Sequence, residues 1–116
     1  MEFDIEIVLR EQNVATTQRL AHPVEPASWH EDDVEAVLKQ ILLAIDRAKN
    51  PAAGATHVAL RGFSWIVEPL DADVVIAIEI PMGAAVAGPF AIDQRRLDEM
   101  IRRVIAAAAL PGPTVH

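Results

Sequence analysis

Residues 56–80 read THVALRGFSWIVEPLDADVVIAIEI, and this stretch decides the fold. Segments 56–68 and 73–80 are rich in β-branched and aromatic residues, which favour strands. Between them, Pro69-Leu70-Asp71-Ala72 has the length and residue types of a hairpin connection. We therefore predict an antiparallel β-hairpin.

The register of this hairpin follows if Glu68 lies opposite Asp73. One face then carries Ala59, Phe63, Trp65, Val67, Val74, Ile76, Ile78 and Ile80, and is apolar enough to face the core. The other face carries the facing pairs Ile66–Val75, Ser64–Ala77 and Gly62–Glu79.

Upstream of the hairpin, residues 3–9 alternate in a pattern that predicts a strand with one face on a core. Residues 14–20 form a second strand or an irregular extension of the first. Ser28 and Glu31 have the spacing of a capping box, which predicts that an amphipathic helix begins there. The apolar stripe of that helix ends before Asn50-Pro51.

Downstream, residues 82–92 contain Gly83, Gly88 and Pro89 and no charged side chain. This composition predicts an apolar loop, which lines either a pocket or an interface. Asp93 is placed to cap a second amphipathic helix, with Ile92 and Leu97 as a hydrophobic staple.

Together these segments predict a single α+β domain over residues 1–110, with a flexible C-terminal tail over residues 111–116. The predicted order is β-β-α-β-β-α. An antiparallel sheet of about four strands, covered on one face by two amphipathic helices, buries every apolar stripe at once.

Charge and composition restrict the partners of this 116-residue chain. Seventeen acidic and ten basic residues give a net charge of −7, which repels nucleic acid and anionic membranes. The absence of cysteine removes disulfides and thiolate sites, and no secretory signal is visible, so we expect a cytoplasmic protein. Four arginines, Arg95, Arg96, Arg102 and Arg103, predict a solvated helix face paired with Asp98 and Glu99, or alternatively a phosphate-binding stripe.

Glu79 is the candidate binding residue because it interrupts an otherwise apolar strand. In the predicted register it shares a face with three small residues, Gly62, Ser64 and Ala77. A carboxylate above a floor of small side chains leaves a concavity that suits a cationic or hydrogen-bond-donating ligand. The alternative is an ordinary solvent-facing glutamate on the wet side of the sheet.

Catalytic and metal-binding arrangements are not predicted. His30, Glu31, Asp32 and Asp33, with His22 upstream, are the nearest approach to a metal site. Consecutive helical positions fan out by roughly 100° and do not converge on one ion, so these carboxylates are expected to favour a helix N-terminus instead. No nucleophile, base and orienting group can be grouped, and no cofactor is expected.

Several short motifs resemble gyrase-inhibitor-like effector-binding domains. These motifs are Phe3-Asp4-Ile5-Glu6-Ile7, Asn13-Val14-Ala15, Arg19, His22-Pro23, the acidic-aliphatic strand 73–80 ending in Pro81, and Gly88-Pro89-Phe90. The resemblance implies two pseudo-symmetric hairpin-and-helix units with a groove that binds small molecules without transforming them. Those domains have further strands after the second helix, where their ligand-binding glutamate lies, so that residue has no counterpart in this chain.

Two functions are therefore predicted. The first is a non-catalytic small-ligand-binding or sensor-like domain that takes a small cationic or aromatic ligand. The alternative is a protein-interaction module, acting as a homodimer or another homo-oligomer, in which the second sheet face or residues 82–92 pack against another chain.

Overall fold

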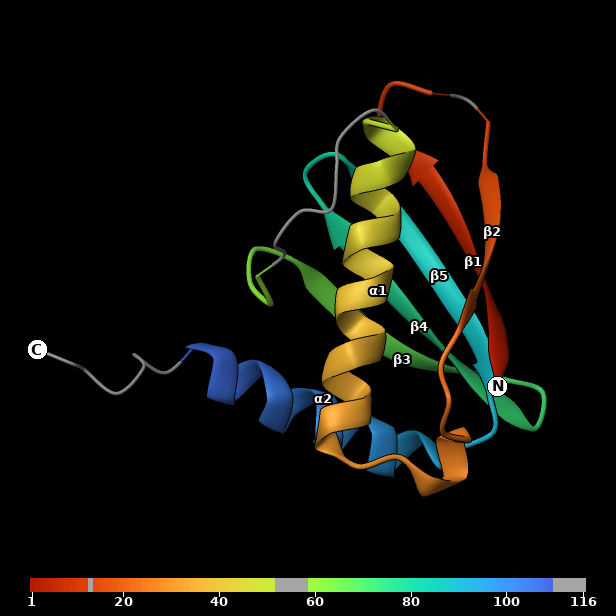
Figure 1. The fold of residues 1–116 in the computed structure, drawn as a ribbon, viewed down its shortest axis with the longest axis vertical. Helices are drawn as coiled ribbons and strands as arrows, with labels where there is room; N and C mark the ends of the chain where they lie inside the picture. Colours follow the sequence, from red (N-terminus) through yellow and green to blue (C-terminus); the bar gives the residue numbers. More distant parts are fainter. Residues whose placement is uncertain (13, 52–58, 110–116) are drawn as a thin grey trace, which may run out of the picture.

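The computed structural model describes residues 1–12, 14–51 and 59–109, and its framework is one five-stranded antiparallel sheet. The strands are β1 (Glu2–Leu9), β2 (Thr16–Ala21), β3 (Ser64–Leu70), β4 (Asp73–Ile80) and β5 (Gly83–Phe90). Their spatial order is β2-β1-β5-β4-β3 (Figure 1). Helix α1 (Glu31–Lys49) follows β2 in the chain, and α2 (Gln94–Ala109) follows β5.

The predicted α+β class is confirmed, and the first two strands are separate elements joined as a hairpin. The predicted tail over residues 111–116, and the start of the predicted strand over residues 56–58, lie outside the described residues. Within the described part of the chain, neither helix is both long and apolar enough to cross a membrane.

Strict alternation in the strands gives the sheet one buried and one exposed face. In β1, every second side chain from Phe3 to Leu9 is buried, and the intervening ones are exposed. The helix α1 crosses the buried face and contacts β1 and β5, while α2 contacts β3 and α1 (Figure 1). We call the opposite face, which carries Glu6, Ala77 and Val86, the outer face; it packs against no other element of the described chain.

The predicted loop over residues 82–92 is wrong, because most of this segment is β5, the central strand of the sheet. The order is accordingly β-β-α-β-β-β-α. Glycine disfavours a strand locally, but the strand next to β5 leaves no room for a side chain at Gly83. A Cβ on Gly83 would lie 2.5 Å from the carbonyl oxygen of Val8. The lack of charge is explained by burial, since Ala85 and Ala87 lie in the core.

The hairpin of β3 and β4 forms, but β3 begins at Ser64, so the predicted strand is wrong over residues 59–63, and the register is shifted by two residues. Leu70, rather than Glu68, lies opposite Asp73, so the connection shortens to Asp71-Ala72. Asp71 adopts a φ of 55°, the left-handed region that short hairpin turns require and that aspartate tolerates. A shift of two keeps the residues of β3 and β4 on their predicted faces but changes their partners across the hairpin, whereas Ala59, predicted on the core face, is exposed and precedes the strand.

Helix α1 begins at Glu31 and not at Ser28, so the predicted capping box is wrong. Ser28 lies in a short 3₁₀ helix, and His30 is the N-cap residue of α1. The backbone N–H of His30 donates to Asp33 Oδ2 at 2.9 Å. The helix starts late because Trp29 is fully buried and its indole N–H donates to the Val24 carbonyl at 2.8 Å, which holds the chain extended at that point.

Asp33 also joins the start of α1 to the end of the first hairpin. Its Oδ1 lies 2.8 Å from Nε2 of His22, whose exposed fraction is 7%. At α2, the predicted cap is confirmed: the backbone N–H of Arg96 donates to Asp93 Oδ2 at 3.0 Å, and Leu97 is fully buried.

Replacing Asp33 with Ala should lower the free energy of unfolding by roughly 1–2 kcal/mol, because the backbone N–H of His30 and the ring of His22 lose a shared acceptor. Urea denaturation measures this change. Ser28→Ala is the matched control and should alter stability by less than about 0.5 kcal/mol, since Ser28 is exposed and caps no helix. A greater loss for Ser28→Ala than for Asp33→Ala would contradict the observed helix start.

Asp33 should also make stability depend on pH. The backbone N–H of His30, and secondly the side chain of His22, hold the pKa of Asp33 below its ordinary value. The stabilisation is therefore present at neutral pH and is lost as the pH falls below roughly 4, the ordinary aspartate pKa, through the lower folded-state pKa. We expect the wild type to lose more unfolding free energy than Asp33→Asn over this acid range in urea titrations. Parallel curves for the two proteins would overturn this assignment.

Candidate functional site

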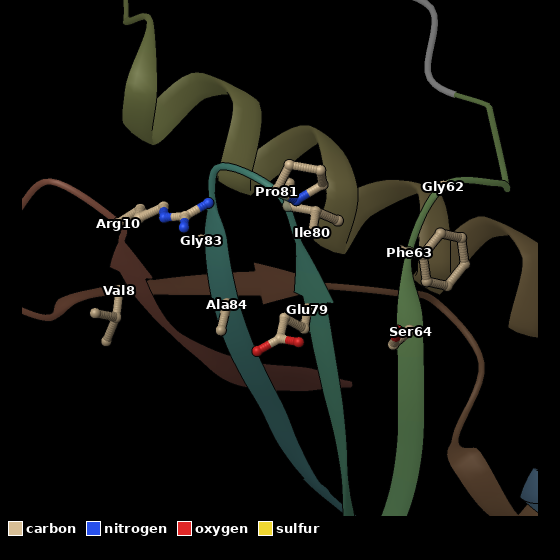
Figure 2. A pocket seen from close by; sticks show the side chains of 10 residues that line it. All are labelled: Val8, Arg10, Gly62, Phe63, Ser64, Glu79, Ile80, Pro81, Gly83 and Ala84. Carbon is tan, nitrogen blue, oxygen red and sulfur yellow. The ribbon is translucent and has the colours of Figure 1, made fainter.

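An open cavity of about 730 Å³ lies at one end of the outer face, within the size range of small-molecule sites. It is bounded by the ends of β1 and β4 and by the starts of β3 and β5 (Figure 2). Its lining residues are Val8, Arg10, Gly62, Phe63, Ser64, Glu79, Ile80, Pro81, Gly83 and Ala84.

The floor of the cavity is a row of side chains that run across four strands. Ser64 lies opposite Glu79, Glu79 opposite Ala84, and Ala84 opposite Val8. Adjacent strands are roughly 5 Å apart, so the row spans roughly 15 Å. Because Ala84 is small, the middle of this row is low and the residues on either side stand above it.

Two opposite charges face this low point. Figure 2 shows the Glu79 carboxylate leaning from β4 toward Ala84, and the Arg10 side chain reaching from the end of β1 toward Gly83. Neither side chain has a hydrogen-bond or ion-pair partner among the described residues. The cavity therefore presents one available carboxylate and one available guanidinium, with the Ser64 hydroxyl beside Glu79.

Three of the four predicted site residues line this cavity: Glu79, Gly62 and Ser64. Ala77 does not, and the two-residue shift of register explains why. Ala77 lies opposite Ile66 instead of Ser64, one step further along the outer face, while Ser64 moves directly opposite Glu79.

Gly62 lines the cavity and also has a backbone conformation that favours glycine. Its φ is +77°, and a Cβ built on it would meet no atom within 4 Å. The positive φ is therefore a reason for glycine at this point of the chain entering β3, in addition to its place at the cavity. The residue that keeps the floor low is Ala84, which belongs to the strand that the sequence did not predict.

Arg10 is the site residue that sequence reasoning missed. It continues the alternation of β1 by one step, so it shares the outer side with Val8. The alternation of β1 alone indicates that Arg10 lies on the outer side of the sheet, but it does not indicate that Glu79 lies two strands away. That relation depends on β5 lying between β1 and β4.

The arginines of α2 are mostly occupied by protein partners. Arg96 donates to the backbone carbonyls of Ala27 and Trp29 at 2.9 and 2.7 Å. Arg102 pairs with Asp98, as predicted, and lies over the Trp65 ring, whereas Arg103 pairs with Glu31 of α1 instead of Glu99. These contacts hold α2 in place and leave little free charge for a phosphate-binding stripe.

The acidic start of α1 is likewise structural. Asp33 bonds to His30 and His22, and Glu31 to Arg103. Among residues 1–12, 14–51 and 59–109, no group of three His, Asp or Glu side chains is arranged to hold a metal ion. Of the predicted candidates, the cavity at Glu79 is the one in which two opposite charges without a partner among the described residues line a single cavity.

No known protein family, curated protein or solved structure matches the chain. The resemblance to gyrase-inhibitor-like effector-binding domains is neither supported nor opposed by these comparisons, and it stays a prediction.

Proposed function

We propose that the chain is a non-catalytic small-ligand-binding domain, and that its ligand occupies the cavity between Glu79 and Arg10. The observation that carries the proposal is that two opposite charges, neither of which has a partner among the described residues, line one cavity. Such charges are stabilised by a ligand that supplies a partner for each, and charge-assisted hydrogen bonds are the strongest of their kind.

The ligand that fits this arrangement carries both charges. The backbone positions of Glu79 and Arg10 are separated by two strand spacings, roughly 10 Å, and one two-residue step, roughly 7 Å. Figure 2 shows that both side chains lean toward β5, the strand that lies between them, so their charged ends point toward the same part of the cavity. We therefore infer a small molecule with a cationic group for Glu79, an anionic group for Arg10, and an apolar or aromatic body against Val8 and Ala84.

We propose binding without catalysis because of the residues that line the cavity. The cavity contains one hydroxyl, that of Ser64, and its described lining residues include no histidine to activate it. Glu79 and Arg10 are charged groups that bind and orient, and we assign them only these roles.

The second candidate function, a protein-interaction module, is favoured by a separate observation. Four of the exposed large hydrophobic side chains, Val8, Ile66, Leu70 and Val86, all lie on the outer face. Exposed apolar side chains gathered on one face mark interaction surfaces.

The ligand proposal predicts a split between two probes. Glu79→Gln should weaken binding of both para-(aminomethyl)benzoate and benzylamine by roughly tenfold or more, because each loses a charge-assisted hydrogen bond of about 1.5–3 kcal/mol. Arg10→Gln should weaken only para-(aminomethyl)benzoate, since benzylamine has no carboxylate. Chemical-shift titration by NMR measures both affinities and locates the shifts.

Glu68→Gln is the matched control, because Glu68 lies on the outer face, two residues past Ile66, and does not line the cavity. It should bind both probes as the wild type does. If the wild type binds neither probe, or if all four proteins bind them equally, the proposal is wrong.

A further inference from the structure

The exposed apolar side chains of the outer face form a continuous diagonal. It runs from the end of β1, across β5 and β4, to the end of β3 at the opposite corner of the sheet. We call it the diagonal stripe, and its residues are Val8, Val86, Ala77, Ile66, Val75 and Leu70. The exposed fractions of its four largest exposed members are 43% for Val8, 44% for Val86, 51% for Ile66 and 48% for Leu70.

The dimensions of the stripe fit one helix. It crosses three strand spacings, roughly 14 Å, and three two-residue steps, roughly 20 Å, so its diagonal is roughly 25 Å. At 1.5 Å per residue, a helix of about 16 residues covers that length. The buried face of the same sheet already shows the sheet packing against helices.

Acidic side chains lie on both sides of the stripe. Glu6 flanks it on β1, next to Val86, and Glu79 flanks it on β4. Glu68 lies on β3 between Ile66 and Leu70. None of these three carboxylates has an ion-pair partner among the described residues.

The charges of the whole outer face indicate whether a second copy of this chain or a different protein binds the stripe. Its acidic residues are Glu2, Asp4, Glu6, Glu68, Asp73 and Glu79, and its basic residues are Arg10 and Arg19. Arg19 is already paired with Asp4 at 3.0 Å and with Glu2 at 3.8 Å. A second copy would bring the same excess of negative charge, and like charges across an interface are unfavourable.

The outer edge of β3 is poorly suited to strand addition. Its Val67 carbonyl accepts a hydrogen bond from the Gln94 side chain at 3.0 Å, and Pro69 has no N–H to donate. A partner at this side of the sheet therefore binds the face and not the edge.

We propose that the diagonal stripe is the docking surface for a basic amphipathic helix of another protein. The apolar side of that helix covers Val86 and Ile66, and its Lys or Arg side chains pair with Glu6 and Glu68. The stripe and the cavity share Val8, but none of these four residues lines the cavity, so they can be changed without altering its lining.

The test uses a pair of fluorescent 18-residue helical peptides with the same leucine face, one with lysine and one with glutamate on its other positions. We expect the full chain to bind the lysine peptide, with affinity that falls as salt increases, and not to bind the glutamate peptide. The Val86→Thr/Ile66→Thr double variant should bind the lysine peptide at least tenfold more weakly. Val14→Thr is its control, since Val14 is 71% exposed in the β1–β2 connection, outside the outer-face register.

The charge contribution is tested separately with Glu6→Gln/Glu68→Gln, and Glu25→Gln, also exposed but away from the sheet, is the control. The first variant should lose both affinity and part of the salt dependence. Equal binding of the two peptides, or unchanged binding by either double variant, would overturn the proposal.

A dimer in sedimentation that Val86→Thr/Ile66→Thr dissociates would assign the stripe to a second copy of this chain instead. Binding of para-(aminomethyl)benzoate should be unaffected by Val86→Thr/Ile66→Thr, which keeps the two proposals distinguishable.

Discussion

The close contact between β5 and its two neighbours is the constraint on which the rest of the structure depends. Gly83 has no room for a side chain beside the Val8 carbonyl, and Ala85 and Ala87 are buried beneath the helices. With β5 in the centre, the first hairpin and the β3–β4 hairpin become one continuous sheet with a single core. Without it, each hairpin would have one more exposed edge, and a lone hairpin is marginally stable in water.

Both proposed surfaces follow from that central position. The small side chain of Ala84, near the start of β5, leaves a low floor between Glu79 and Arg10, which come from the strands on either side of β5. Further along the same strand, Val86 joins the apolar residues of β1 and β3 into one stripe. Because both helices pack on the opposite side, this face keeps exposed apolar side chains, and Glu6, Glu68 and Glu79 have no partner among the described residues.

Local periodicity predicted the elements whose environment is set by their own sequence: the alternation of residues 3–9, the faces of the β3–β4 hairpin and the cap at Asp93. The errors arose where a distant contact outweighs local preference. A glycine such as Gly83 disfavours a strand locally, but the close approach of the Val8 carbonyl leaves no room for a side chain at this position. Burial of Trp29 moves the start of α1 from the predicted Ser28 to Glu31. The sequence placed Glu79 and Ser64 side by side on the face that carries the cavity because a shift of two preserves the face of a strand. It did not place Arg10 there because the neighbours of Arg10 depend on β5.

Hydrogen exchange at the Ala85 and Ala87 amides tests the central position of β5 most directly. In the structure, Ala85 lies between Ile7 and Ile78, and Ala87 between Ile5 and Ile76, so both amides belong to ladders with strands on either side. The account predicts that these amides exchange only when the whole domain unfolds, as slowly as those of β1 and β4. Exchange as fast as in an unstructured peptide would show that residues 83–90 are a loop, and would contradict the fold, the cavity and the stripe together.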